Sequence, residues 1–245
     1  MSTPRDAVIL AAGRGVRLGE LGLMRPKGFI ELGGRPIIER SLEYLTTMGI
    51  ARVLIVTGHQ AQFYRELARR RQGIDLLHNA RYAESGSMYS LYLARESVRD
   101  EFLLLESDLI YERRALDTLA AAATDALLVS GPTHSGDEVY VEASGPRLTG
   151  LSKKRADLAG DVIGELVGIS RLSPSCLQAM CAYAERVFRD TLRLEYEQAL
   201  VAAAHQMPVN CPLVSDLAWA EIDDAHQLER ARSQVFPRIL ERDAA

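Results

Sequence analysis

A glycine-rich loop near the start of the chain has the composition of a phosphate-binding turn. Residues 10–19 read Leu-Ala-Ala-Gly-Arg-Gly-Val-Arg-Leu-Gly, and small residues let backbone N–H groups approach a chain of phosphates closely. The glycine spacing, G-x-G-x-x-x-G, differs from the dinucleotide-binding fingerprint, and no G-K-[ST] ending marks a P-loop. The loop alone is therefore equally compatible with a nucleotide site and with an ordinary strand-to-helix turn.

Two aspartates that are far apart in the sequence each follow a short apolar run. Asp108 comes after residues 102–105, and Asp223 comes after residues 217–222. Open α/β sheets place their ligands beyond the carboxyl ends of the strands, and two carboxylates, completed by phosphate oxygens and water, suit the octahedral coordination of Mg²⁺. Each aspartate could instead have a structural role. Asp108 could cap the helix that follows it, and Asp223 or Asp224 could cap the helix expected from residue 225.

Five short apolar runs in the first half of the chain predict the strands that position these residues. The runs are nearly continuous rather than alternating, as strands buried on both faces are. Helical patterns separate them, and this alternation predicts a mostly parallel sheet covered by helices. The strands are expected at residues 7–10, 53–56, 74–77, 102–105 and 126–129, and the helices at residues 36–48, 63–71, 87–98 and 112–123.

The pattern changes after about residue 130. Gly131-Pro132 and the alternating run at residues 138–142 predict a turn and hairpin strands. Ser173-Pro174 predicts a helix start, with serine as the N-cap and proline at the first helical position. Two more helices are expected, at residues 195–205 and at residues 225–240 with Pro237 near the end. No repeat or linker divides the chain, so we expect one domain over residues 1–245.

Composition and charge argue against several classes of protein. Of the 245 residues, 47% are hydrophobic and 25% are charged, which is average for a soluble globular protein. A balance of 29 Lys and Arg against 33 Asp and Glu gives a net charge of −4, which weighs against nucleic acid or an anionic membrane as a partner. The lack of an apolar run of about 18 residues, and of an apolar stretch at the start, weighs against a membrane span and a signal peptide.

The three cysteines, Cys176, Cys181 and Cys211, include no C-x-x-C pair. An odd count without that spacing predicts neither a disulfide framework nor a zinc site. Free thiols suit a reducing compartment, so we expect a cytoplasmic protein.

The residues that follow the glycine-rich loop are more specific. The loop, L-A-A-G-x-G-x-R, is followed by Arg25-Pro26-Lys27 and by a G-x-P-[IL] helix start at residues 34–37. This order resembles the sugar-phosphate nucleotidylyltransferase (pyrophosphorylase) superfamily. The resemblance spans most of the chain, because it continues through Val56-Thr57-Gly58-His59, Asn79, Glu106-Ser107-Asp108 and Trp219-Ala220-Glu221-Ile222-Asp223.

Within that superfamily, the chain looks most like the phosphocholine and 2-aminoethylphosphonate cytidylyltransferases. The matching motifs are G-S-M-Y-S-L at residues 86–91, S-K-K at residues 152–154 and G-E-L-V-G-I at residues 164–169. The resemblance implies an α/β, Rossmann-like nucleotidyltransferase fold, in which helices flank a mostly parallel mixed sheet and the acceptor side has a small hairpin and helical portion. Residues 1–130 would form the nucleotide-binding half, and residues 131–245 the acceptor-binding half.

The resemblance also implies roles for particular residues. Arg17 and Lys27 would contact the triphosphate, where cations offset the charge that builds on the leaving pyrophosphate, and Lys153 would join them as a catalytic residue. Asp108 and Asp223 would hold Mg²⁺, which leaves Asp224 as the helix cap. The nucleotide site would comprise Leu10, Ala11, Ala12, Gly13, Gly15, Arg17, Lys27, Thr57, Gly58, Asn79, Gly86, Ser87 and Glu106, and the acceptor site Lys153, Lys154, Glu165 and Trp219.

The implied reaction is a cytidylyl transfer. A phosphonate or phosphate oxygen of the acceptor would attack the α-phosphorus of CTP in line, and pyrophosphate would leave. Such an acceptor is ionised at neutral pH, so positioning and charge stabilisation can supply the catalysis without a general base. Two alternatives are a sugar-1-phosphate nucleotidylyltransferase that uses UTP, GTP or dTTP, and a regulatory subunit that binds a nucleotide without turnover.

The acceptor is predicted from the balance of aromatic and acidic residues. A choline headgroup needs an aromatic cage, whereas a primary amine needs carboxylates or carbonyls that accept its N–H donors. Aromatic residues make up 6% of the chain, while the second half offers Glu165, Glu195, Glu197 and Asp216. We therefore expect 2-aminoethylphosphonate or a related small phosphonate, with phosphocholine next. The sequence is also compatible with a homo-oligomer.

Overall fold

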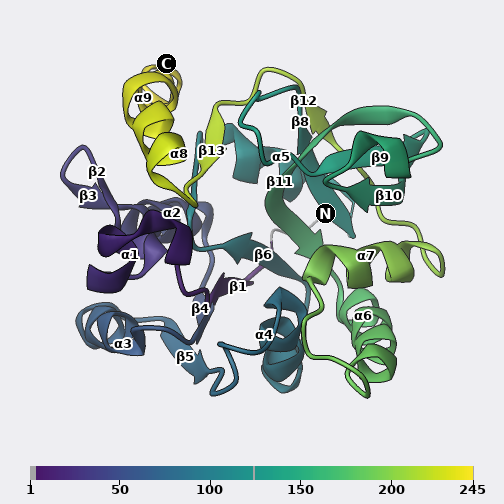
Figure 1. The fold of residues 1–245 in the computed structure, drawn as a ribbon, viewed down its shortest axis with the longest axis horizontal. Helices are drawn as coiled ribbons and strands as arrows, with labels where there is room; N and C mark the ends of the chain where they lie inside the picture. The colour runs from purple at the N-terminus through teal and green to yellow at the C-terminus, as the bar shows by residue number, and fades with distance from the viewer. Residues whose placement is uncertain (1–3, 124, 245) are drawn as a thin grey trace.

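The computed structural model describes residues 4–123 and 125–244, which form an α/β structure around one nine-stranded sheet (Figure 1). The main path of the sheet has the order β10-β9-β11-β6-β1-β4-β5, while β8 pairs with β11, and β12 pairs with β8. The strands are β1 (Asp6–Ala11), β4 (Arg52–Thr57), β5 (Ile74–His78), β6 (Phe102–Glu106), β8 (Ala126–Ser130), β9 (Tyr140–Ser144), β10 (Arg147–Ser152), β11 (Val162–Leu172) and β12 (Leu213–Val214).

All five predicted strands are present, as β1, β4, β5, β6 and β8. The first four form a parallel group, in which β1 lies between β4 and β6, and β5 pairs with β4. The fifth does not join this group directly, because β11 lies antiparallel between β6 and β8. The structure confirms the predicted mostly parallel mixed sheet, in which β11 is an antiparallel strand between β6 and β8.

The strand β11 is the main element that the sequence does not predict. Two glycines, Gly164 and Gly168, interrupt its apolar pattern. Gly168 has a φ of 81°, in the left-handed region that favours glycine. It lies where the pairing with β8 shifts register, between Leu166 and Ser170. A strand that contains such a bulge shows little of the periodicity from which strands are recognised.

Most predicted helices form with shifted ends. Ser173 caps its helix as expected, because its side chain accepts a hydrogen bond from the Cys176 N–H. The main helices are α2 (Ile37–Met48), α3 (Ala61–Arg70), α4 (Ser87–Ala94), α5 (Arg114–Ala121), α6 (Pro174–Val187), α7 (Tyr196–Ala204), α8 (Ala225–Arg230) and α9 (Phe236–Asp243).

Two of these helices correct the prediction. The helix α5 begins at Arg114 rather than at residue 112, and it follows a short strand, β7 (Leu109–Tyr111), that the sequence does not predict. The expected single helix at residues 225–240 consists of α8 and α9 joined by a π-helical turn, Ala231–Val235. Pro237 therefore lies in the first turn of α9, where its missing N–H is tolerated, rather than near the end of a helix.

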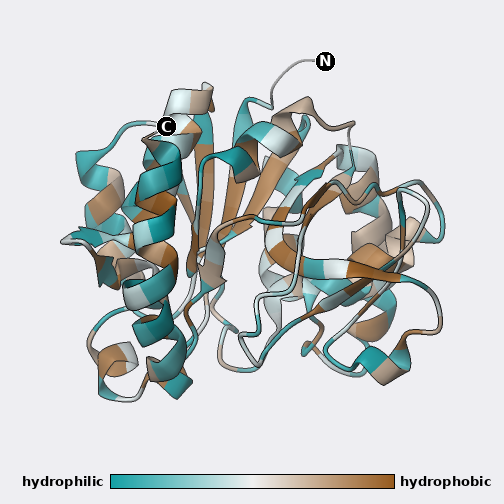
Figure 2. Ribbon diagram, turned by 90° about the horizontal axis from the view of Figure 1, so that it is seen from above, coloured by the Kyte–Doolittle hydropathy of each residue, from teal (hydrophilic) through white to brown (hydrophobic). Residues whose placement is uncertain are grey.

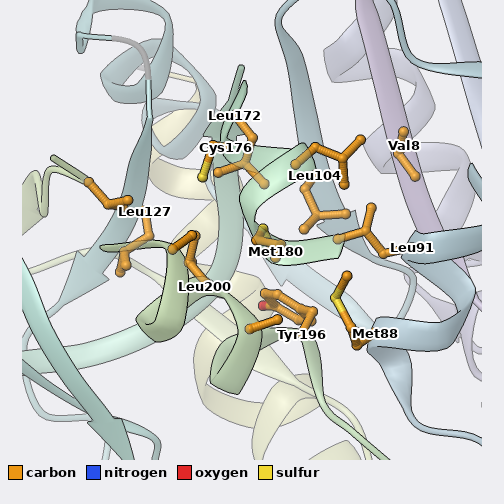
Figure 3. Packing of buried hydrophobic residues seen from close by; sticks show 14 of the residues in the cluster. Val8, Met88, Leu91, Leu104, Leu127, Leu172, Cys176, Met180, Tyr196 and Leu200 are labelled. Carbon is orange, nitrogen blue, oxygen red and sulfur yellow. The ribbon is translucent and has the colours of Figure 1, made fainter. Parts of the chain in front are cut away.

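Alternating residues of the central strands pack toward opposite faces of the sheet. In β1, Val8 and Leu10 join the core beneath α4, α6 and α7, whereas Ala7 and Ile9 join the core beneath α2, α3 and α5. Figure 2 shows the resulting band of hydrophobic strands between the helices, and Figure 3 shows the first core, where Met180 of α6 and Leu91 of α4 lie near Leu104. Burial on both faces explains why these strands are nearly continuous apolar runs.

Within residues 4–123 and 125–244, no helix has the length and apolarity needed to cross a bilayer. Residues 1–3, which contribute to the prediction that there is no signal peptide, lie outside the described residues.

Candidate active site

A cavity of about 710 Å³ opens at the carboxyl ends of β1 and β6. Its walls come from the loops that follow β1, β5 and β6, from residues 193–197 at the start of α7, and from Lys153 after β10. Large cavities at this edge of an open α/β sheet are the usual place for a ligand.

Most of the predicted site residues line this cavity, although the sequence spreads them over more than 200 positions. They are Leu10, Ala11, Ala12, Gly13, Gly15, Arg17, Lys27, Asn79, Gly86, Ser87, Glu106, Asp108, Lys153 and Asp223.

Five predicted residues do not line the cavity. Thr57 is buried and donates to the Leu77 carbonyl at 3.2 Å, and Gly58 allows the close approach of Tyr82 and the Ala12 carbonyl. Glu165 accepts from the backbone and hydroxyl of Thr133. Trp219 packs against the core beneath α2, α3 and α5, and Lys154 is exposed. The structure places these five as supports or surface residues around the site.

A small two-stranded sheet brings the two predicted metal ligands together. β7 pairs antiparallel with β13 (Trp219–Glu221), and beyond this pair the Ile222 N–H donates to the Asp108 carbonyl at 3.0 Å. Asp108 therefore precedes one strand at the same end where Asp223 follows the other. Because residues 109–111 are extended, Asp108 caps no helix there.

The ammonium group of Lys27 contacts both Asp108 and Asp223. Burial would lower the pKa of Lys27, but the two carboxylates outweigh it and hold the pKa well above its ordinary value. Burial would raise the pKa of Asp223, but Lys27 and Arg17 hold it below its ordinary value. These contacts favour the ionised forms of both Lys27 and Asp223.

Asp224, next to Asp223, has a structural role. Its side chain accepts from the Gln227 N–H at 2.8 Å and caps α8. The Gln227 side chain in turn accepts from the Asp223 N–H at 2.6 Å. Asp224 therefore caps a helix, whereas Asp223 lines the cavity. This geometry is compatible with the predicted roles of the two aspartates.

Glu221 is a residue of this site that sequence reasoning missed. Glu106, Asp108 and Glu221 each place a carboxylate oxygen within 4.8 Å of the others. Burial, followed by repulsion from neighbouring carboxylates, raises the pKa of both glutamates. The signal was available, because Glu221 lies two positions before Asp223, and alternate residues of a strand share a face.

The wall formed by residues 79–90 is held by its own polar side chains. Asn79 is fully buried, and its amide donates to the Ser85 and Ser90 hydroxyls at 3.0 Å. The Ser87 hydroxyl donates to Glu195 at 2.6 Å and accepts from the Tyr196 N–H at 2.9 Å. These contacts tie α4 to α7, so Asn79 and Ser87 support the wall in addition to lining it.

Further acidic groups line the α7 side of the cavity. Oε2 of Glu197 is buried and has no hydrogen-bond partner among the described residues. Burial is the main factor that raises the pKa of Glu197, to about 7. The Tyr196 hydroxyl donates to Glu106 at 2.8 Å. This part of the cavity therefore places several carboxylates close together, and one oxygen of Glu197 is available to a ligand.

The fold and the site, with a glycine-rich loop, paired cations and an acidic cluster at one sheet edge, have the features of a nucleotidyltransferase domain. The sequence pattern of the MobA-like NTP transferase domain matches residues 7–236. The chain belongs to this family.

Individual relatives agree with this assignment. A CMP-5'-(3-aminopropyl)phosphonate synthase of Streptomyces rubellomurinus is 32% identical over 259 residues, covering 98% of this chain and 41% of that protein. A choline-phosphate cytidylyltransferase of Streptococcus pneumoniae is 26% identical over 168 residues, covering 64% of this chain and 73% of that protein. The chain thus spans less than half the length of the first relative.

Solved structures confirm the predicted fold. An inositol-1-phosphate CTP transferase from T. maritima superposes with a TM-score of 0.82 at 20% identity, covering 98% of this chain and 96% of that one. The Rossmann-like nucleotidyltransferase architecture expected from the sequence is therefore correct.

The contact between α4 and α7 gives a test of the cavity wall. A Cβ atom at Gly86 would overlap the backbone of Leu194, so Gly86→Ala should separate the two helices and lower the free energy of unfolding by about 1–3 kcal/mol. Nucleotide affinity measured by calorimetry should fall with it. The matched control is Gly160→Ala, where only the flexible side chain of Glu142 must move; equal behaviour of the two variants would contradict this role of Gly86.

Proposed function

We propose that the chain transfers the CMP group of CTP to a phosphonate oxygen of a small aminoalkylphosphonate and releases pyrophosphate. The observation that carries the proposal is the meeting in one cavity of Arg17, Lys27 and Lys153 with the acidic group around Asp108. The names of the Streptomyces and Streptococcus relatives specify CMP or cytidylyl products of a phosphonate and of choline phosphate. They support both the nucleotide and the class of acceptor.

In this reaction the phosphonate oxygen forms a bond to the α-phosphorus of CTP, and the bond from that phosphorus to the β-phosphate oxygen breaks. Arg17 and Lys27 offset the negative charge that develops on the departing pyrophosphate. Lys153 orients the acceptor phosphonate as a point charge. Because the attacking oxygen is already ionised, this chain needs only to position the groups and stabilise charge. We assign the nucleotide to the walls from residues 1–130 and the acceptor mainly to those from residues 131–245.

The residues present fit a Mg²⁺ ion. The donor set consists of carboxylate oxygens, the ligands that Mg²⁺ prefers, and Oδ1 of Asp108 is buried without a hydrogen-bond partner among the described residues. Asp108 and Asp223, which both contact Lys27, would hold the ion. Oxygens of Glu106 and Glu221 lie within 4.8 Å of one oxygen of Asp108. When bound, Mg²⁺ supplies charge stabilisation at the phosphate oxygens.

The acceptor amine is assigned to the acidic side of the cavity. Glu106, Glu197 and Glu221 all line the cavity, and a primary ammonium group offers three N–H donors. Burial, and then repulsion between carboxylates, raises the pKa of Glu106 and Glu221, and the positive charge of the amine would offset that repulsion. This part of the proposal favours an acceptor with an amine over one without a cationic group, such as a sugar phosphate.

A screen for pyrophosphate release tests the reaction directly. CTP, UTP, GTP and dTTP should each be combined with 2-aminoethylphosphonate, phosphocholine and glucose 1-phosphate in the presence of Mg²⁺. We expect the highest kcat/KM with CTP and 2-aminoethylphosphonate. A higher value for phosphocholine would correct the acceptor alone, whereas a higher value for UTP with glucose 1-phosphate would overturn the proposed function.

The neighbouring aspartates Asp223 and Asp224 provide a matched pair of variants. Asp223→Ala should lower turnover by about 10²-fold or more, because a ligand of the ion that would offset developing negative charge is lost, and it should also weaken Mn²⁺ binding measured by electron paramagnetic resonance. Asp224→Ala should lower the free energy of unfolding by about 1 kcal/mol through loss of the cap and keep turnover nearly unchanged. Near-normal turnover in Asp223→Ala would remove it from the site.

Glu197 provides a test of amine recognition. Glu197→Gln removes a charge that a bound ammonium group would meet, so kcat/KM for 2-aminoethylphosphonate should fall by about tenfold, in the range of one charged hydrogen bond. The value for ethylphosphonate, which lacks the amine, should stay constant. Glu66→Gln on the exposed surface of α3 is the control. An equal loss with both substrates would place the amine elsewhere.

A further inference from the structure

One carboxylate connects the cation of the phosphate-binding loop with the cation on the acceptor side. Asp137 lies in the loop at residues 131–139, between β8 and β9. Its Oδ2 is 3.0 Å from Nη1 of Arg17, and its Oδ1 is 2.6 Å from Nζ of Lys153. Each oxygen of the same carboxylate thus serves a different cation, and both cations line the cavity.

The base of this loop is fixed to the protein at Thr133. The Thr133 N–H and hydroxyl donate to Glu165 at 3.0 and 2.7 Å, and Arg230 donates to the Thr133 carbonyl at 2.7 Å. These contacts attach one end of the loop to β11 and to α8. Any movement of Asp137 is therefore a movement of the loop tip, not of the whole segment.

Residues 135–138 at the tip of the loop make hydrogen bonds within the loop and to two exposed cations. His134 and Gly136 have φ values of 55° and 86°, and the Gly136 N–H donates to Glu138 within the loop itself at 2.9 Å. The side chains of Arg17 and Lys153 are 55% and 59% exposed. Ion pairs with partners this exposed contribute little to stability, so a more highly charged anion can replace the carboxylate.

We propose that Asp137 is an internal counter-ion that occupies a phosph(on)ate site formed by Arg17 and Lys153 and is displaced when a substrate anion binds. The proposal rests on the proposed function in assigning these two cations to substrate. A carboxylate and a phosphonate both present pairs of oxygens to cations in similar geometry. The phosphonate carries the higher charge, and so it competes successfully for the same two groups.

The counter-ion explains how two like charges are held close together before substrate arrives. Arg17 and Lys153 come from segments that are far apart in the sequence, and they repel each other. Asp137 offsets this repulsion in the free protein, at the expense of some affinity for the substrate anion. Removal of its charge should therefore tighten the binding of phosph(on)ates.

The test compares Asp137→Asn with Asp161→Asn, which makes the same change of charge on an exposed residue. Calorimetry with inorganic phosphate alone should show binding about three- to tenfold tighter in Asp137→Asn and unchanged in Asp161→Asn, the range given by two exposed ion pairs. The KM for 2-aminoethylphosphonate should fall by a similar factor. Weaker or unchanged phosphate binding in Asp137→Asn would overturn the proposal.

A second variant shows whether the effect passes through Lys153. In a Lys153→Ala background, Asp137→Asn should produce less than half of its gain in phosphate affinity, because one of the two released cations is gone. A full gain in that background would overturn the bridging role. Phosphate binding needs no turnover, so this result is separate from the proposed function, which is tested by pyrophosphate release from the wild-type protein in the nucleotide screen.

Discussion

The mutual repulsion of four carboxylates at one sheet edge is the constraint on which the rest of the site depends. Glu106, Asp108 and Glu221 have oxygens within 4.8 Å of one another, and Asp223 lies close enough to share Lys27 with Asp108. In a partly buried site such charges interact more strongly than in water. Lys27 and Arg17 offset part of this repulsion, and the backbone pairing around the two aspartates fixes their positions.

The two aspartates are positioned by the pairing of β7 with β13. Ion pairs hold the end of these strands that is opposite the aspartates. Glu112, only 1% exposed, accepts from Arg114 at 2.7 Å and from Arg242 of α9 at 2.9 Å. Both arginines also bind Asp216, just before β13. A buried glutamate with two arginine partners is well compensated, whereas loss of one partner would leave a charge buried. The C-terminal helix α9 thus helps to fix a site that it does not line.

The sequence predicted the parts of this structure that depend on local pattern. Strands β1, β4 and β6 are recognisable because burial on both faces makes them continuous apolar runs, and the Ser173 cap is recognisable because one side chain satisfies a nearby N–H. The strand β11 is not, because Gly164 and Gly168 interrupt its apolar pattern and its strand partners come from distant segments. For the same reason the tasks of Glu165 and Thr57, whose partners are Thr133 and Leu77, could not be read from residue type.

The charges of the site reveal a general property of the free protein. Each cation that we assign to substrate already meets a carboxylate: Arg17 meets Asp137 and Asp223, Lys27 meets Asp108 and Asp223, and Lys153 meets Asp137. Substrate binding at such a site is an exchange of counter-ions rather than an addition of charge to empty positions. The free energy of substrate binding then depends on how much more strongly the cations bind a phosphate oxygen than a carboxylate oxygen. It also depends on whether the displaced carboxylates contact another cation. A divalent ion for the aspartates and an ammonium group for the glutamates would meet that need, so the nucleotide, the metal and an amine-bearing acceptor form a mutually compensating set.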